Sequence, residues 1–145
     1  PFGVLVLDLD HFKKYNDTWG HLAGNEALQM TASAIKSVIR SVDFPARYGG
    51  EEFVVLIPRC NPEGLAHTAE RIRTAVESLP PIADRRRLTI SIGGALYPHD
   101  GRTADELFAA ADRRLYGAKE GGRNRAVLPE KISNVLPHDP RRKRR

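Results

Sequence analysis

The segment Ala46-Arg-Tyr-Gly-Gly-Glu-Glu-Phe-Val-Val-Leu-Ile57 decides the fold of this chain. Residues typical of strands flank its Gly49-Gly50 pair on both sides, and this pattern predicts a β-hairpin. The two arms of a hairpin run antiparallel, which excludes a purely parallel, doubly wound sheet. The adjacent carboxylates of Glu51 and Glu52 repel each other in the turn. They therefore indicate either an exposed acidic turn or a site that a cation or partner compensates.

The rest of the chain alternates between strand and helix patterns. Phe2–Leu9 is a short apolar run, typical of a strand buried on both faces. After the polar stretch 11–25, apolar residues recur at helical spacing, and we expect Asn25 to be the N-cap of a helix of about four turns. Further expected elements are helices after Asn61-Pro62 and Thr103, a strand over 88–96, and a short closing strand within 124–128. This order predicts an α/β (α+β) fold with a central, mixed, largely antiparallel sheet flanked by helices.

Composition limits the class of protein. The chain has 145 residues, of which 41% are hydrophobic and 28% charged, as expected for one globular domain. No apolar run approaches the ~18 residues of a membrane span, and the lone Cys60 excludes an internal disulfide framework or a multi-cysteine zinc site. We expect no signal peptide, because the sequence opens on a strand pattern without a basic segment before it. We therefore expect a reducing, cytoplasmic location, with membrane anchoring left open for a longer parent protein.

The net charge of +5 is unevenly distributed. Residues 129–145 contain six Lys or Arg and two Asp or Glu, so most of the excess lies in this final segment. We expect residues 129–145 to form a basic, disordered tail. Such a tail could contact nucleic acid or anionic lipid. The body of the chain lacks a basic cluster with interleaved aromatic residues, so no nucleic-acid partner is expected.

A second acidic pair follows the first apolar run. Asp8 and Asp10 are two residues apart, so on a strand they face the same side and can reach one cavity. Cations such as Mg²⁺ prefer carboxylate and carbonyl oxygens together with substrate phosphates. Asp8 beside the Gly-Gly-Glu-Glu turn of a neighbouring strand would form a two-carboxylate Mg²⁺ site suited to nucleotidyl transfer. Taken alone, the Asp-Leu-Asp sequence is equally consistent with a polar strand end.

Several spaced motifs together resemble the GGDEF family of diguanylate cyclases, whose signature is present here in its Gly-Gly-Glu-Glu-Phe form. The resemblance covers residues 2–128 and rests on Asp8-Leu-Asp-His-Phe-Lys-Lys-Tyr-Asn-Asp17, Gly20-His21, Arg47-Tyr48, Ser91-Ile-Gly93 and Ala118-Lys-Glu-Gly-Gly-Arg-Asn124. It implies the palm-like fold of nucleotidyl cyclases. It also implies condensation of two GTP into cyclic di-GMP and two pyrophosphates across a homodimer.

The resemblance also implies roles for individual residues. Mg²⁺, with Mn²⁺ as an alternative, would be held by Asp8, the Leu9 carbonyl and Glu51. The implied catalytic residues are Glu51 as proton acceptor, Glu52 as support for a second metal or the turn, and Lys13 as a stabiliser of transition-state charge. The implied GTP-binding residues are Asn16, His21 and Asn25 for guanine, and Lys119 and Arg123 for the phosphates. Without the family pattern, Lys13, Lys119 and Arg123 are typical surface charges.

Position 25 and the start of the chain depart from the family pattern. The family usually has Asp where this chain has Asn25, whose amide oxygen accepts hydrogen bonds without the help of a negative charge. We therefore expect weaker guanine selection or binding, with the chemistry retained. The family also has a helical segment before its first strand. We expect residues 1–128 to be a GGDEF domain without that segment, detached from the sensory domain of a longer protein.

A regulatory site and an alternative function follow from the same resemblance. Arg40-Ser-Val-Asp43 matches the family's R-x-x-D inhibitory motif, which implies feedback inhibition by cyclic di-GMP with Arg71 as a secondary contact. Taken alone, such an Arg and Asp are a common surface pair. The alternative function is a catalytically silent module that binds GTP or cyclic di-GMP as a receptor. The presence of Asp8, Glu51 and Glu52 favours the enzyme.

Overall fold

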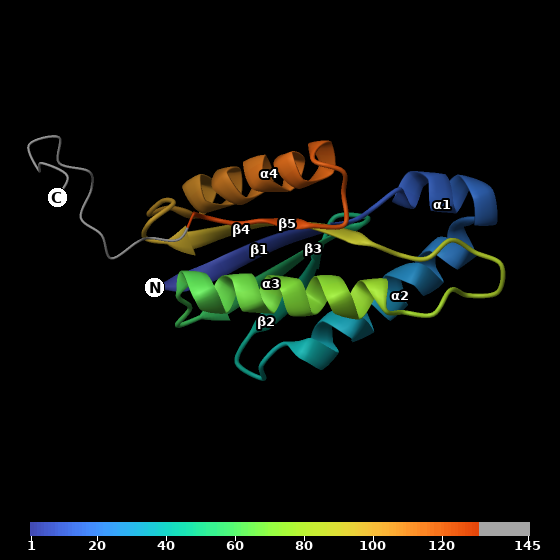
Figure 1. Ribbon diagram of the computed structural model, residues 1–145, viewed down its shortest axis with the longest axis horizontal. Coiled ribbons are helices and arrows are strands. Elements are labelled where there is room, and N and C mark those ends of the chain that lie inside the picture. The colour runs from blue at the N-terminus through green and yellow to red at the C-terminus, as the bar shows by residue number, and fades with distance from the viewer. Residues whose placement is uncertain (131–145) are drawn as a thin grey trace, which may run out of the picture.

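The computed structural model describes residues 1–130, which form a five-stranded sheet with helices on both faces (Figure 1). The sheet order is β2-β3-β1-β4-β5. The strand β1 lies at its centre and pairs antiparallel with β3 and β4, β2 pairs antiparallel with β3, and β4 pairs parallel with β5. The bounds are β1 Phe2–Leu9, α1 Phe12–Trp19, α2 His21–Val38, β2 Phe44–Tyr48, β3 Glu52–Pro58, α3 Pro62–Glu77, β4 Ile90–Tyr97, α4 Ala104–Glu120 and β5 Ala126–Val127. The predicted mixed, largely antiparallel sheet is confirmed.

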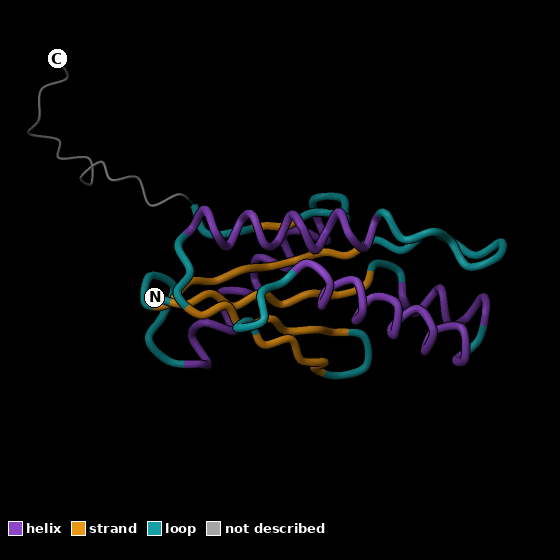
Figure 2. Tube along the Cα trace, turned by 90° about the horizontal axis from the view of Figure 1, so that it is seen from below, coloured by secondary structure: helices purple, strands orange, loops and turns teal. Residues whose placement is uncertain are grey.

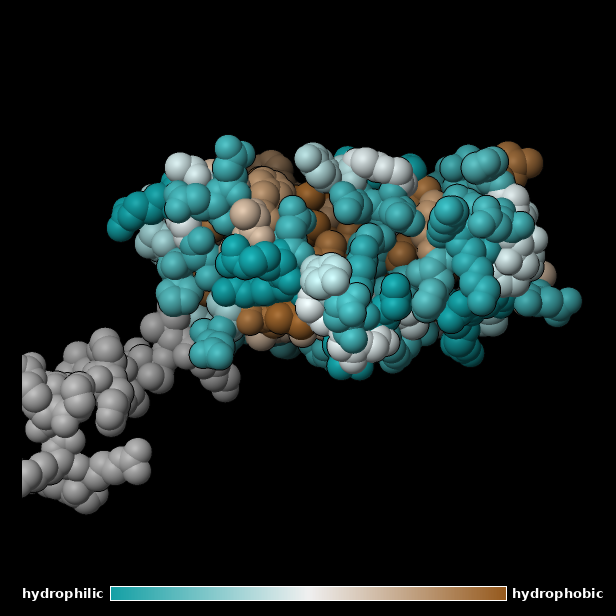
Figure 3. Space-filling view, turned by 90° about the horizontal axis from the view of Figure 1, so that it is seen from above, coloured by the Kyte–Doolittle hydropathy of each residue, from teal (hydrophilic) through white to brown (hydrophobic). Residues whose placement is uncertain are grey.

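The central strand is buried on both faces, as its continuous apolar run predicts. Leu5 and Leu7 belong to the core beneath α2 and α3, and Val4 and Val6 belong to a second core beneath α4. Alternate side chains of a strand point to opposite faces, so one strand supplies both cores. Figures 1 and 2 show α4 on one side of the sheet and α2 and α3 on the other. Viewed from the α4 side, the surface is mostly hydrophilic with scattered apolar patches (Figure 3).

Helix α4 lies unusually close to β4 because of Gly93. A Cβ atom at this position would lie 2.1 Å from the Ala111 carbonyl oxygen and 2.3 Å from the Leu115 backbone nitrogen. Both contacts are with backbone, which cannot rotate away as a side chain can, so only glycine fits. This close packing positions the last turn of α4 beside the end of β1.

The local signals read from the sequence are confirmed at the hairpin and at two helix starts. Tyr48 pairs with Glu52, which leaves Gly49, Gly50 and Glu51 as the turn, and Gly49 has a φ of 78°. The Asn61 side chain caps α3 by accepting a hydrogen bond from Gly64 N, and the Thr103 hydroxyl caps α4 by accepting one from Glu106 N.

The start of the second helix differs from the prediction. Asn25 is not an N-cap, because α2 begins four residues earlier at His21, and α1 occupies part of the stretch 11–25 that we expected to be only polar. The buried residues at the start of α2 include Ala23, Gly24 and Ala27, whose small side chains give a weak hydrophobic signal. That weakness is why the predicted helix begins too late.

The short helix α1 has a signal that the prediction missed. Phe12, Tyr15 and Trp19 recur at helical spacing, and the rings of Tyr15 and Trp19 pack with centroids 4.7 Å apart. The expected basic tail, 129–145, lies outside the described residues except for its first two positions. Within residues 1–130, no helix is both long and apolar enough to cross a membrane.

Candidate functional site

The end of β1, the hairpin turn and the last turn of α4 converge on one cavity. Asp8 is paired in the sheet with Glu52 of β3 on one side and Ser91 of β4 on the other. Its side chain lies on the face that α4 covers, and Asp8 is only 4% exposed. The cavity has a volume of about 170 Å³ and is lined by Asp8, Leu9, Asp10, His11, Phe12, Lys13, Glu51, Lys119 and Arg123. Segments from positions 8 to 123 therefore meet at one place.

The carboxylates around this cavity are held in an unfavourable environment. Burial raises the pKa of Asp8, against the opposing effect of a hydrogen bond from Lys119 Nζ at 2.5 Å, and the charge of Asp10 raises it further. Burial also raises the pKa of Glu51 and of Glu52, and for each of them the charge of Asp8 adds to the shift. The charged forms of these three neighbouring carboxyl groups are therefore all unfavourable. Such a cluster favours the binding of a cation.

The donor set fits a divalent cation that also contacts a substrate. Lys119 already places a positive charge beside Asp8, so the site accommodates a cationic group. Within residues 1–130, no three His, Cys, Asp or Glu side chains lie close enough to enclose a metal by themselves. Carboxylates of Asp8 and Glu51 and the main-chain carbonyl of Leu9 are the oxygen ligands that Mg²⁺ prefers, and substrate phosphates commonly complete such a site.

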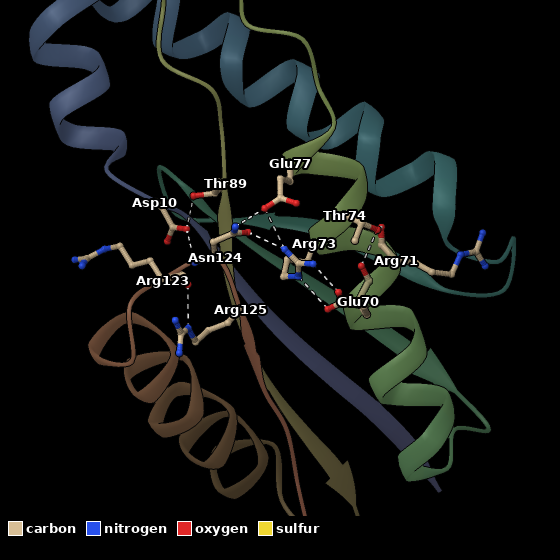
Figure 4. Close-up of polar contacts among 10 residues, drawn as sticks. All are labelled: Asp10, Glu70, Arg71, Arg73, Thr74, Glu77, Thr89, Arg123, Asn124 and Arg125. Carbon is tan, nitrogen blue, oxygen red and sulfur yellow. Dashed lines mark hydrogen bonds and ion pairs between the residues drawn. The ribbon is translucent and has the colours of Figure 1, made fainter.

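Asp10 differs from Asp8, although the two lie at the same cavity. Its carboxylate accepts hydrogen bonds from Thr89 Oγ1 at 2.7 Å and Asn124 N at 2.9 Å (Figure 4). It also accepts one from Ser91 Oγ at 2.6 Å. These partners occupy both of its oxygens and join β1 to β4 and to the turn after α4. Asp10 therefore has a structural role, which sequence reasoning missed because its partners lie 79 to 114 positions away.

The three residues expected to contact guanine lie on α1 and α2 and do not line the cavity, although Phe12 and Lys13 of α1 do. Asn16 lies on α1 against Gly24, where any Cβ would lie 1.7 Å from Asn16 Oδ1. This oxygen is buried and has no hydrogen-bond partner within the described chain. His21 and Asn25 lie on the first turns of α2 and are exposed. The absence of a Cβ atom at Gly24 thus makes room for the Asn16 amide, whose Oδ1 atom is enclosed by the chain.

The residues of the R-x-x-D motif lie at a separate cavity of about 300 Å³ between β3 and α3. Arg40 Nη2 donates to Asp43 Oδ1 at 3.0 Å and to the Pro58 carbonyl at 2.8 Å. The Asp43 side chain is 1% exposed and that of Arg40 is 53% exposed, so part of the guanidinium faces solvent. Arg71, from α3, lines the same cavity together with Arg59. The structure therefore brings together the three residues grouped from the sequence and adds a third arginine.

Comparisons with known proteins find close relatives. A family profile described as "Diguanylate cyclase, GGDEF domain" matches residues 1–125. Diguanylate cyclase A from Treponema denticola is 42% identical over 136 residues, which is 92% of this chain and 36% of that protein. The chain spans about a third of the length of the curated relatives it matches.

Solved structures agree with this similarity. The GGDEF domain of DgcB from Caulobacter crescentus, solved in complex with c-di-GMP, has a TM-score of 0.79 and 39% identity over 88% of this chain and 77% of that one. The active GGEEF domain of a diguanylate cyclase from Vibrio cholerae has a TM-score of 0.80 and 34% identity over 88% of this chain and 81% of that one.

The raised pKa of Glu51 predicts how Glu51→Gln affects the stability of the metal-free chain. A carboxyl whose pKa is higher in the folded state than its ordinary 4.5 destabilises the fold above that pH, because its charged form is disfavoured there. The penalty grows as pH rises from the ordinary to the raised value and is then constant. We expect Glu51→Gln to have a higher Tm than wild type at about pH 7 and no advantage near pH 4, measured by circular dichroism.

The matched control is Asp84→Asn, a neutralisation of an exposed carboxyl in the loop before β4. It should not reproduce the pH-dependent gain. A Glu51→Gln variant that is less stable than wild type at neutral pH would contradict the electrostatic account of the site.

Proposed function

The chain belongs to the GGDEF family of diguanylate cyclase domains, and on that premise we propose that it condenses two GTP into cyclic di-GMP and two pyrophosphates. The observation that carries the proposal is the shared cavity, where Asp8, Glu51 and the Leu9 carbonyl lie beside three cationic side chains. Oxygen ligands for a cation next to cations for phosphates suit nucleotidyl transfer from a triphosphate.

The metal ligands in this proposal are Asp8, the main-chain carbonyl of Leu9 and Glu51, with Mg²⁺ as the ion and Mn²⁺ as an alternative. When bound, the ion neutralises phosphate charge and lowers the pKa of the attacking hydroxyl. The raised pKa of Asp8 and of Glu51 supports this assignment, because a bound cation offsets both the burial and the neighbouring negative charge that raise them. Glu52, on the same turn, supports a second metal or the turn itself.

The reaction needs a proton acceptor and positive charge along the triphosphate. The 3′-oxygen of one GTP forms a bond to the α-phosphorus of the other, the bond from that phosphorus to the bridging oxygen breaks, and pyrophosphate leaves. Glu51 accepts the hydroxyl proton. Lys13 stabilises the charge that develops on the phosphate, and Lys119 and Arg123 hold the triphosphate from the other side of the cavity.

Guanine recognition is assigned to Asn16, His21 and Asn25. The buried Asn16 Oδ1, which has no hydrogen-bond partner within the described chain, supports this assignment, because an amide that the fold leaves unsatisfied is typical of a functional position. Each chain then binds one GTP, and each 3′-hydroxyl must reach the α-phosphate of the other. A homodimer in which two cavities face each other therefore completes the site.

The extent of the domain is part of the proposal. We assign residues 1–128 to the cyclase domain, since the last strand of the sheet ends at Val127. Of the segment 129–145, which the sequence predicts to be a basic tail, the structure describes only Pro129, which is buried, and Glu130, which is exposed. A sensory domain in a longer protein would bring two such domains together.

The first test is product formation from GTP with Mg²⁺, measured by chromatography. Wild type should form cyclic di-GMP, and Glu51→Gln should lose at least about 100-fold in kcat because it removes the proton acceptor and a charged metal ligand. Thr74→Ala, an exposed substitution on α3, serves as the control and should retain activity. A wild-type chain that binds GTP or cyclic di-GMP without turnover would overturn the cyclase and identify the receptor function instead.

The second test concerns Asn25, where the family usually has Asp. An aspartate adds charge assistance to the hydrogen bonds from the guanine edge, which an amide lacks. Asn25→Asp should therefore lower the KM for GTP and increase the preference for GTP over ATP, both measured by steady-state kinetics. Unchanged values of both would remove position 25 from guanine recognition.

Feedback inhibition is assigned to the cavity at Arg40, Asp43 and Arg71. Cyclic di-GMP offers two phosphates and two guanine edges, and the guanidinium groups of Arg40 and Arg71 suit both. The buried Asp43 holds the Arg40 guanidinium in place. The site lies apart from the cavity that contains Asp8 and Glu51, which we call the GTP cavity. The product therefore binds there without occupying the substrate site.

Arginine variants test this assignment through inhibition curves. Arg40→Ala and Arg71→Ala should each raise the cyclic di-GMP concentration for half-inhibition by about tenfold or more, because each removes a charged hydrogen-bond donor. Arg71→Ala is the cleaner variant, since Arg40→Ala removes the ion-pair partner of the buried Asp43 carboxylate. Arg113→Ala, exposed on α4, is the control. Equal inhibition of wild type and both variants would reject the site.

A further inference from the structure

The turn that follows α4 has an uncommon backbone conformation. Arg123 and Asn124 have φ angles of 65° and 47°, in the left-handed region that residues other than glycine seldom adopt. Two hydrogen bonds close the turn, from Arg123 N to the Ala118 carbonyl at 2.9 Å and from Asn124 N to Asp10 Oδ2 at 2.9 Å. Arg123 lines the cavity that contains Asp8 and Glu51, and the backbone of this turn sets the point from which its side chain starts.

The Asn124 side chain ties this turn to α3. Its Nδ2 group donates to Glu77 Oε2, and its Oδ1 atom accepts a hydrogen bond from Arg73 Nη1 at 3.1 Å. Figure 4 shows Asn124 between the two sides: Arg73 approaches it from α3, and Arg123 points away from α3 on the other side. Both ends of the amide are therefore used, and asparagine is among the residues that tolerate the left-handed region best.

Arg73 is itself held in one orientation. Its Nε atom donates to Glu70 Oε2 at 2.9 Å and its Nη2 atom to Glu70 Oε1 at 2.6 Å, which is a two-pronged ion pair. Its Nη1 atom also lies 3.3 Å from Glu77 Oε2, and its side chain is 17% exposed. A planar guanidinium fixed at both prongs presents its remaining donor in a defined direction. That donor is Nη1, which donates the hydrogen bond that Asn124 Oδ1 accepts.

We propose that Asn124, oriented by Arg73, is a positioning residue that directs Arg123 onto the phosphates of GTP. The inference rests on the proposed function, in which Arg123 binds the triphosphate. Asn124 acts through Arg123 and touches no substrate atom. A purely structural role for Asn124 would instead lower the stability of the domain without acting selectively through Arg123.

The experiment measures binding of 3′-deoxy-GTP with Mg²⁺ by isothermal titration calorimetry, since this analogue lacks the attacking hydroxyl and cannot react. Asn124→Gly removes the amide but keeps a residue that adopts the left-handed conformation freely. Arg73→Lys keeps the charge but loses the fork, and Arg73→Ala loses both. Thr74→Ala, next to Arg73 on α3, is the control. Each variant is also made in an Arg123→Ala background.

Asn124→Gly should weaken binding of 3′-deoxy-GTP by about tenfold, and Arg73→Ala by several-fold, with incomplete rescue in Arg73→Lys. In the Arg123→Ala background, Asn124→Gly should weaken binding of 3′-deoxy-GTP by less than about twofold, because the arginine through which Asn124 acts is absent. Binding of cyclic di-GMP at the Arg40 cavity should be unchanged in all variants, which shows that the fold is intact.

Two results overturn different claims. If wild type binds 3′-deoxy-GTP but the losses from Asn124→Gly and Arg123→Ala are independent and multiply, the positioning role is wrong and the proposed function stands. If wild type binds no 3′-deoxy-GTP, the proposed function fails, and the positioning role fails with it.

Discussion

The buried carboxylate of Asp8 is the constraint on which the rest of the structure depends. A charge taken out of water destabilises a fold unless another charge or a set of hydrogen bonds compensates it. Lys119 provides that charge from the last turn of α4, and it reaches Asp8 because Gly93 lets α4 lie directly on the backbone of β4. The position of one helix and the identity of one glycine are thus tied to a single side chain at the centre of the sheet.

The two aspartates at the end of β1 show how a fold separates function from structure. Asp10 has hydrogen-bond partners on both oxygens, and these bonds hold β1, β4 and the turn after α4 together. Within the described residues Asp8 has one ion-pair partner, Lys119, and its own charge adds to the effect of burial in raising the pKa of Glu51 and Glu52. A carboxylate cluster of this kind lowers the stability of the fold by itself and is suited to binding a cation. Functional sites commonly combine lower stability with binding capacity in this way.

Helix α3 serves two different places with two neighbouring arginines. Arg71 reaches the cavity that also contains Arg40, and Arg73 reaches Asn124 on the other side of the helix (Figure 4). Residues two apart on a helix point in widely different directions, so one helix can contact both. The apolar side of α3, with Leu65, Ile72 and Val76 buried, holds both arginines in place against the sheet.

Local sequence by itself determined the hairpin, the central strand, the starts of α3 and α4, and the mixed, largely antiparallel sheet, because glycine pairs, caps and apolar periodicity act over a few residues. It placed the start of α2 wrongly and missed α1, since small buried residues and a short amphipathic stretch give weak periodic signals. Only the tertiary structure decided which of two nearly identical aspartates is saturated with hydrogen bonds, and that Asn124 lies between Arg73 and Arg123. Those contacts join residues 50 or more positions apart, and their geometry comes from helix and sheet packing that no local pattern encodes.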